Sequence, residues 1–178
     1  MLLDQTKLPL QEELIECRDY RRVAEAIRRL EVRGAPAIGA AAAFGLVLGA
    51  AEIVRNQADL AAELPAVAAQ LKGTRPTAVN LFWAIERMMQ VYTSHQHEAS
   101  VEEILVKLEA AAVEIADKDK LVNESIAQHG ATLFTQPVSI LTHCNAGALA
   151  TVAVGTALGV IERAWREGNV TEVFADET

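Results

Sequence analysis

The sequence is poor in several residue types that mark common protein classes. It holds only two cysteines, Cys17 and Cys144, and a disulfide framework needs more. Aromatic residues make up 4% of a chain that is 51% hydrophobic and rich in alanine, which favours closely packed helices over a β-sandwich. The scarcity of cysteine also indicates a reducing environment, so we expect a cytoplasmic location.

A basic face is missing as well. The chain carries 16 Lys and Arg against 24 Asp and Glu, a net charge of −8, and no block of basic residues. Proteins that bind nucleic acid through a broad surface neutralise many phosphates with such residues, so we expect no nucleic acid partner. A small anion held by two or three arginines remains compatible with this composition.

Neither a signal peptide nor a membrane span is expected. Asp4, Lys7 and Pro9 interrupt the apolar stretch that a signal peptide requires. The charge-free run 34–51 has the length of a membrane span, but alanine and glycine make up most of it. We interpret it as a helix of the protein core, where Gly45 and Gly49 permit close contact between helices.

Hydrophobic periodicity outlines a helix-rich α/β protein. An apolar, partly β-branched run from Val138 predicts a buried strand, and residues 171–178 predict a second one with a helix between them, which is a right-handed βαβ unit. We therefore expect a helical N-terminal domain over residues 1–130 and the beginning of a doubly wound domain over 131–178. Helices are predicted over residues 20–31, 34–51, 59–71, 78–92, 101–130 and 148–166.

Two turns of similar composition precede helices. Arg33 and Gly34 stand before a helix that has Pro36 in its first turn, and Arg75 stands at the start of another. A guanidinium beside the free N–H groups of a helix N-terminus suits a phosphate. A solvated arginine is the ordinary interpretation of either turn alone, but the pair can converge on one phosphate.

Cys144 follows the predicted strand at Val138, in a turn that leads into the next helix. The carboxyl ends of strands in α/β folds face a crevice where reactive groups gather, so we predict that Cys144 lies in an active site. His95 and His97 form a further pair, but no other metal ligands are evident near them and we predict no metal site.

Four motifs in this order resemble the methylthioribose-1-phosphate isomerases, a family within the superfamily that includes the initiation factor 2B regulatory subunits. The cysteine-containing motif is the most discriminating, since the translation-factor relatives lack that cysteine. The motifs are LDQTKLP at residues 3–9, VRGAPAIG at 32–39, RPTAVNL at 75–81 and THCNAG at 142–147.

The resemblance implies a helical N-terminal domain, a Rossmann-like C-terminal domain and a site between them. It implies that Arg33, Gly34, Ala35 and Arg75 bind the sugar phosphate and that Cys144 is the catalytic thiol. The implied reaction converts 5-methylthioribose 1-phosphate to 5-methylthioribulose 1-phosphate in methionine salvage, by proton transfer or by hydride shift. No metal or organic cofactor is implied, and the full-length enzyme is implied to be a homodimer.

The chain departs from the family's pattern at its ends. Members of the family begin with a short further segment and continue past residue 178, where the resemblance places the catalytic aspartate; Asp176 is not that residue by position. We therefore expect an N-terminal portion that lacks the carboxylate partner of its thiol. Two alternatives stay open: a non-catalytic regulatory or scaffold subunit of the initiation factor 2B type, and an isomerase of another sugar 1-phosphate such as ribose 1,5-bisphosphate.

Overall fold

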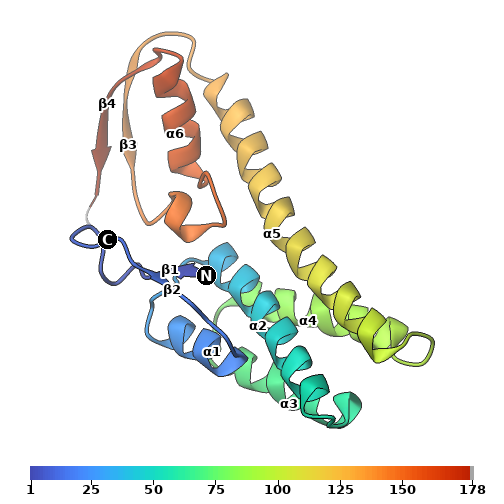
Figure 1. Cartoon of the computed structure of the whole chain (residues 1–178). Coiled ribbons are helices and arrows are strands. Elements are labelled where there is room, and N and C mark those ends of the chain that lie inside the picture. The colour runs from blue at the N-terminus through green and yellow to red at the C-terminus, as the bar shows by residue number, and fades with distance from the viewer. Residues whose placement is uncertain (177–178) are drawn as a thin grey trace. The chain divides into compact units, whose positions relative to one another are not determined.

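A computed structural model describes residues 1–176 of the chain (Figure 1). Glu177 and Thr178, the end of the predicted strand 171–178, lie outside the described residues. The internal contacts divide the chain into unit 1, Met1–Ile115, and unit 2, Ala116–Thr178, and each is described by itself. The predicted domain boundary after residue 130 stays a prediction.

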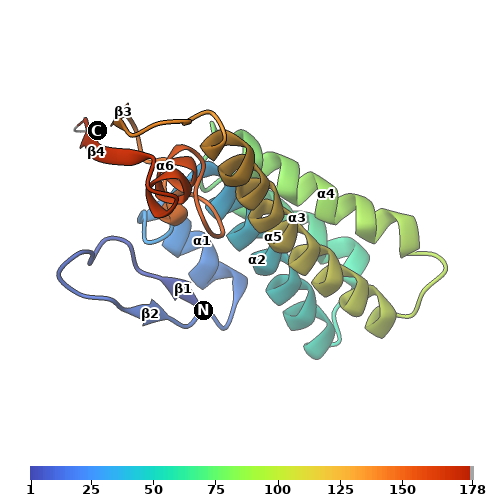
Figure 2. The same cartoon turned by 90° about the horizontal axis from the view of Figure 1, so that it is seen from above.

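The elements of unit 1 are two short strands and a group of helices, the last of which continues into unit 2. They are β1 (Leu2–Leu3), β2 (Leu14–Ile15), α1 (Tyr20–Arg28), α2 (Ala35–Arg55), α3 (Leu60–Lys72), α4 (Val79–His95) and α5 (Val101–Ala131). The two strands pair antiparallel and form an arm that precedes α1 (Figure 2).

Helix α1 begins where the sequence predicts and ends earlier. The Asp19 side chain accepts a hydrogen bond from the Arg22 backbone N–H at 2.9 Å, which caps the first turn. Leu30 adopts a left-handed conformation with φ 61°, and the Glu31 N–H donates to the Ala26 carbonyl at 2.9 Å. This reversal closes the helix before residue 31. Helical spacing with Val23, Ala24 and Ile27 predicts Leu30 on the apolar face of this helix, and that prediction is wrong because the reversal leaves Leu30 exposed.

Helix α2 is the core helix of unit 1. It contacts α1, α3 and α4, and although it is long and apolar enough to cross a membrane, 67% of its most apolar window is buried inside the protein. A Cβ on Gly45 would lie 3.1 Å from Leu71, and one on Gly49 would lie 2.5 Å from Val67. The predicted role of these glycines in close helix packing is therefore confirmed.

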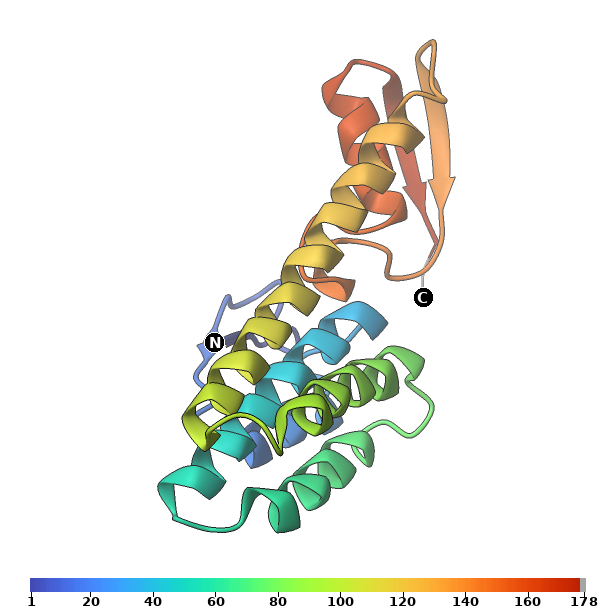
Figure 3. The same ribbon diagram turned by 90° about the vertical axis from the view of Figure 1, so that its right-hand side faces the viewer.

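Helices α2 and α4 lie side by side and run in the same direction (Figure 3). Near their N-terminal ends, a Cβ on Gly39 would lie 3.0 Å from the Asn80 carbonyl oxygen. Near their C-terminal ends, Val54 and Tyr92 line one pocket. The first turns of both helices consequently lie at the same end of unit 1.

The long helix α5 buries different faces along its length. Ser100 and Glu103 form a reciprocal capping box at its start, with bonds of 2.8 and 3.2 Å. Helical spacing predicts an apolar face that runs along this helix from Ile104 to Ile126. That face is buried in the first half, but Leu121 is 65% exposed and Ile126 40% exposed. The prediction is wrong for the second half, where Asn123 is buried instead.

Unit 2 contains one βαβ arrangement, as the sequence predicts. Its strands β3 (Val138–Thr142) and β4 (Val170–Ala175) are parallel, and helix α6 (Ala157–Arg166) lies against them (Figures 1 and 3). The helix-rich α/β fold class is thus confirmed. One small core cluster is formed by the buried Ala131, Ala164 and Val170, with the partly buried Phe134 and Ile140 packed against it.

Strand β3 is more exposed than predicted. Leu141 is 67% exposed, and of the strand's residues only Thr142 is buried. Within residues 1–176, β3 pairs with β4 alone. A sheet of two strands leaves most of its surface uncovered, so the prediction of a buried strand is wrong for this chain.

The helix predicted over residues 148–166 is also wrong in its first half. A short 3-10 helix, η1 (Ala148–Ala150), is followed by a loop, and α6 begins only at Ala157. Val154 and Gly155 take left-handed conformations with φ 72° and 87°. The loop is held by the bridge between Gly147 and Gly155 and by a 2.7 Å hydrogen bond from the Val152 N–H to Asp119 of α5.

Candidate active site

The first arginine turn lies at the start of α2. Gly34 is the residue that caps the helix, with φ 103° in the left-handed region that favours glycine, and it places Pro36 in the first turn. Arg33 and Ala35, on either side of it, are exposed. Within residues 1–176, no side-chain cap bonds to the first turn of α2, so its N–H donors are not claimed by a cap; Pro36 in this turn has no N–H.

The second arginine turn lies at the start of α4. The half-buried Arg75 accepts a hydrogen bond through its carbonyl from the Ala78 N–H at 3.0 Å. Ala78 occupies the cap position and offers no side-chain acceptor, while the hydroxyl of Thr74 donates to the Leu71 carbonyl at 2.6 Å. The N–H groups at the start of α4 are therefore also without a side-chain cap.

The two turns share a pattern that sets them apart within unit 1. Helices α1, α3 and α5 are capped by Asp19, Asp59 and Ser100, whereas α2 and α4, which carry the arginines, are not. Both uncapped ends lie at the same end of the unit. Two helix N-termini, each with a partial positive charge, therefore lie at the end of the unit where the chain carries Arg33 and Arg75, an arrangement that suits an anion with several oxygens.

Neither guanidinium has a partner among the residues that the structure describes. Across residues 1–176, Arg33 and Arg75 form no ion pair and no side-chain hydrogen bond, whereas seven other arginines form ion pairs. Arg28 and Arg55 are likewise outside the ion pairs of the described residues, so it is the shared place of Arg33 and Arg75 before two uncapped helices at one end of unit 1 that fits a site for an anion.

The cysteine turn belongs to unit 2 and follows β3. Cys144 is exposed and adopts a left-handed conformation with φ 73°. Residues other than glycine, asparagine and aspartate rarely take this conformation, which costs about 1–2 kcal/mol and persists where surrounding structure imposes it. Such strained residues concentrate at functional sites, which agrees with the prediction that Cys144 is reactive.

Sequence reasoning missed a pair beside the thiol. His143 Nδ1 lies 3.4 Å from Asp176 Oδ2, and the Asp176 N–H donates to the Thr142 carbonyl at 3.0 Å. Thr142 and Ala175 are partners in the parallel register, so the residues that follow them, His143 and Asp176, are also neighbours. His143 lies at the end of the first predicted strand and Asp176 near the end of the second, so treating the two as adjacent parallel strands would have brought these residues together.

The other cysteine differs in its surroundings. Cys17 lies partly buried in unit 1, and burial raises the pKa of its thiol, while Arg22 nearby opposes that shift. A raised pKa reduces the fraction of thiolate, which is the reactive form. Of the two cysteines, Cys144 is thus the better placed to act as a nucleophile or a general acid–base group.

No metal centre emerges from the residues that the structure describes, since none of their His, Cys, Asp and Glu side chains gather in groups of three or more suited to an ion. The ring of His95, half of the pair noted in the sequence, has Nδ1 2.8 Å from the Val91 carbonyl oxygen. That contact ties it to the end of α4.

Known proteins resemble the chain over its whole length. It is 52% identical to methylthioribose-1-phosphate isomerase of Heliobacterium modesticaldum and 51% identical to that of Thermosipho africanus, covering 100% of this chain in both cases. It covers 52% and 51% of those proteins, so the chain spans about half the length of the curated relatives it matches.

Two solved structures are similar in fold and sequence. One, described as translation initiation factor eIF-2B subunit delta from A. fulgidus, gives a TM-score of 0.85 at 43% identity over 99% of this chain and 52% of its own. The other, 5-methylthioribose 1-phosphate isomerase from Pyrococcus horikoshii, gives 0.88 at 39% identity over 96% of this chain and 48% of its own. The model of the initiation factor 2 subunit family matches residues 31–178, and the chain belongs to that family.

Proposed function

We propose that the chain is part of an aldose–ketose isomerase that converts 5-methylthioribose 1-phosphate to 5-methylthioribulose 1-phosphate in methionine salvage. The observation that carries this proposal is the identity of 49–52% across the whole chain with relatives named methylthioribose-1-phosphate isomerase. It agrees with the resemblance of four separate motifs, including the one that holds Cys144.

In this proposal Arg33, Gly34, Ala35 and Arg75 bind the phosphate of the sugar. The uncapped N-termini of α2 and α4 at one end of unit 1 support this role, because they offer backbone N–H donors to phosphate oxygens. The unpaired guanidiniums supply the opposite charge and planar pairs of donors. Charge-assisted hydrogen bonds of this kind are the strongest that a protein offers an anion.

Cys144 acts in this proposal as the catalytic thiol. A phosphate on the anomeric oxygen prevents the sugar ring from opening spontaneously, so an acid–base group must assist before hydrogen moves from carbon 2 to carbon 1. The carboxylate expected to work with the thiol is proposed to lie in the part of the enzyme that follows this chain. A substrate deuterated at carbon 2 separates the two possible steps, since proton transfer exchanges the label with water and a hydride shift keeps it.

The setting we propose is a homodimer of the full-length enzyme in the cytoplasm, without a metal, an organic cofactor, nucleic acid or a membrane as partner. The net charge of −8 supports the absence of nucleic acid, because phosphate backbones repel an acidic surface. The burial of α2 supports its role as a core helix and not as a membrane span. Cys17 and Cys144 are both free, which fits a reducing compartment.

A chimera tests the proposal. Residues 1–178 joined to the second half of the Heliobacterium relative should isomerise 5-methylthioribose 1-phosphate, and Cys144→Ser in the same chimera should lower kcat by orders of magnitude. The chain alone, assayed beside it, reports what the second half contributes. A folded chimera that neither binds nor converts the sugar phosphate would refute the proposal.

A second function is favoured by one observation, the 43% identity to the structure described as an initiation factor 2B subunit. A regulatory or scaffold subunit would bind a guanine-nucleotide exchange complex and show no affinity for sugar phosphates. Titration with methylthioribose 1-phosphate, ribose 1,5-bisphosphate and the exchange complex in parallel distinguishes this function from the isomerase and from an isomerase of another sugar phosphate.

A further inference from the structure

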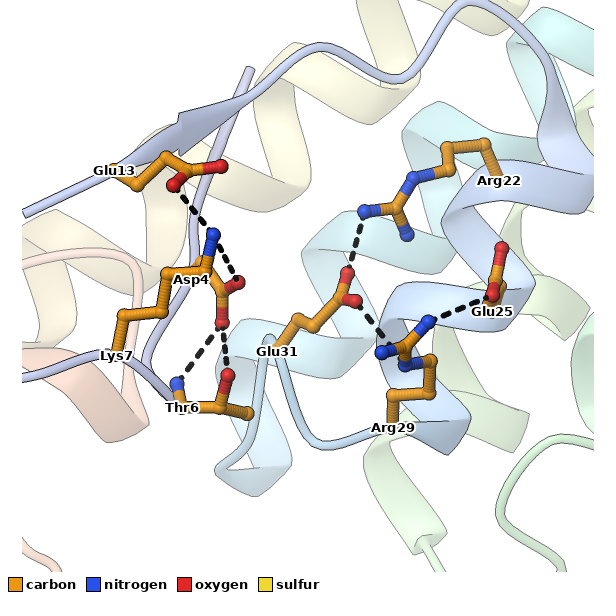
Figure 4. Close-up of polar contacts among 8 residues, drawn as sticks. All are labelled: Asp4, Thr6, Lys7, Glu13, Arg22, Glu25, Arg29 and Glu31. Carbon is orange, nitrogen blue, oxygen red and sulfur yellow. Dashed lines mark hydrogen bonds and ion pairs between the residues drawn. The ribbon is translucent and has the colours of Figure 1, made fainter.

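The N-terminal motif LDQTKLP has no part in the proposed chemistry, yet its acidic residue is buried. Asp4 is only 4% exposed, and its Oδ1 accepts hydrogen bonds from the Thr6 backbone N–H at 3.0 Å and from the Thr6 hydroxyl at 2.6 Å (Figure 4). A carboxylate that bonds two residues ahead forms a local turn. This turn fixes the conformation of the peptide between Asp4 and Gln5.

The turn joins two segments that are far apart in the sequence. The Asp4 N–H donates to the Glu13 carbonyl at 2.9 Å, which continues the β1–β2 pairing. The next N–H, that of Gln5, donates to the Glu31 carbonyl at 2.9 Å. The motif is thereby bonded to the backbone immediately ahead of the first arginine turn.

Glu31 is itself fixed from several sides. Its side chain is only 6% exposed and lies between two arginines, with Oε2 2.7 Å from Arg22 Nη2 and Oε1 3.5 Å from Arg29 Nε (Figure 4). Its N–H donates to the Ala26 carbonyl at 2.9 Å. A buried carboxylate is costly unless it stays paired, so the conformations open to residue 31 are few.

The fixed residue lies next to the proposed phosphate site. Val32 follows Glu31 and is buried, and Arg33 and Gly34 come directly after it. Since Arg33 makes no side-chain bond within residues 1–176, the placement of its guanidinium depends on the backbone that leads into it. That backbone is held by Glu31 and, through Gln5, by Asp4.

We propose that Asp4 and Glu31 are positioning residues for phosphate recognition, which hold the Arg33–Gly34 turn at the start of α2 in its binding conformation. The inference rests on the proposed function, because the anion is the phosphate of its substrate. The physical basis is preorganisation: a turn already held in the bound conformation loses less conformational freedom when the ligand arrives.

Titration calorimetry on the 178-residue chain tests the proposal, with 5-methylthioribose 1-phosphate and inorganic phosphate as the two ligands. Glu31→Gln should raise Kd for both by about fivefold, because the neutral amide loosens the residue from its arginines. Glu52→Gln is the matched control. It removes a comparable ion pair, Arg21–Glu52, between α1 and α2 without touching the turn, so it should leave Kd unchanged.

Asp4 is tested with a pair of variants. Asp4→Ala removes the acceptor for both Thr6 bonds and should raise Kd severalfold. Asp4→Asn keeps an oxygen at the same place and should retain most of the affinity, a rescue that general destabilisation does not predict. Both are titrated well below their melting temperatures, so that loss of folded protein does not enter Kd.

Hydrogen exchange separates failure of this inference from failure of the proposed function. The Ile38 N–H donates to the Gly34 carbonyl at 3.0 Å, and Glu31→Gln should speed its exchange while Glu52→Gln should not. If the wild-type chain binds neither ligand, the result counts against the proposed function. The exchange rate of the Ile38 N–H in Glu31→Gln still decides whether Glu31 holds the turn. Folded Glu31→Gln and Asp4→Ala chains with wild-type Kd, or unchanged exchange at Ile38, overturn the positioning role.

Discussion

Gly155 lies directly against Gly147: a Cβ built on Gly155 would be 2.5 Å from the Gly147 carbonyl carbon. The two residues form an isolated antiparallel bridge, and Gly155 has φ 87°. The segment after Cys144 therefore closes on itself before α6 begins. The shape of the turn that carries the proposed catalytic thiol depends on this contact between two glycines.

Gly155→Ala should destabilise the chain strongly. The left-handed backbone alone costs an alanine roughly 1–2 kcal/mol, and the Cβ would also overlap backbone atoms of Gly147 that cannot move aside, for a total of about 3 kcal/mol. Gly168→Ala is the matched control, since Gly168 has φ 82° and nothing lies within 4 Å of its Cβ position. In denaturant unfolding, Gly168→Ala should lose only the free energy that its left-handed backbone costs an alanine. Equal losses of unfolding free energy in the two variants would contradict the close contact between Gly155 and Gly147.

Gly49→Ala should destabilise unit 1 through packing. The added Cβ would lie 2.5 Å from Val67 Cγ1, so the Val67 side chain or the two helices must shift, at a cost of about 1–3 kcal/mol in the free energy of unfolding. Gly49→Ala combined with Val67→Ala should regain part of that loss, because the smaller side chain makes room. Gly73→Ala serves as control, since its nearest neighbour would be 3.4 Å away. Additive effects of Gly49→Ala and Val67→Ala would argue against direct contact.

The features that sequence alone predicted are those determined by local chemistry. Asp19 stands directly before the helix predicted from residue 20 and is a residue type that caps helices, and its carboxylate does cap α1. Gly34 with Pro36 starts α2 because each residue suits that backbone. The strand–helix–strand order of unit 2 follows from the same kind of local pattern. These elements needed no knowledge of distant residues.

The features that sequence missed depend on residues far apart in the chain. The helix predicted over 148–166 fails because Gly147, Gly155 and Asp119 impose a loop that the apolar periodicity does not reveal. Arg33 and Arg75 lie at the same end of unit 1 because α2 and α4 pack in parallel. The similar composition of the two turns suggested that they can converge, but it did not predict how the helices pack. Helical spacing likewise predicts a buried Leu121 and cannot foresee which face of α5 meets a neighbour.

Replacing Cys144 should separate stability from activity. Cys144→Gly relieves the strain at φ 73°, whereas Cys144→Ala keeps it, so the glycine variant should be the more stable of the two by about 1 kcal/mol in the free energy of unfolding. Both variants lose the thiol, and neither should support isomerase activity in the chimera. Alanine and glycine variants of equal stability would contradict the strained conformation.

The stability of the arm should depend on acid pH. The hydroxyl of Thr6, as hydrogen-bond donor, holds the pKa of Asp4 below its ordinary value of 3.8, against the effect of desolvation. A folded-state pKa below the unfolded one means that ionised Asp4 stabilises the fold above about pH 3.8 and that this contribution is lost as pH falls through the folded pKa. Melting temperatures of the wild type and Asp4→Asn should differ at neutral pH, and the difference should shrink as the pH falls below 3.8 and through the folded-state pKa of Asp4. A constant difference across that window would exclude titration of Asp4 as its source.

Arg75→Ala should weaken the binding of methylthioribose 1-phosphate by about 1.5–3 kcal/mol, the range for a hydrogen bond that involves charge. Arg33→Ala should weaken it similarly, and the double variant should show whether the two guanidiniums contact the same phosphate, since coupled losses are not additive.

Arg55→Ala is the control: Arg55 is exposed, and it stands at the C-terminal end of α2, opposite to Arg33. Because that end carries a partial negative charge and no proposed site, its removal should leave Kd unchanged in titration calorimetry. Equal losses for Arg55→Ala and Arg75→Ala would show that general electrostatic attraction, and not a site at the start of α2 and α4, accounts for binding.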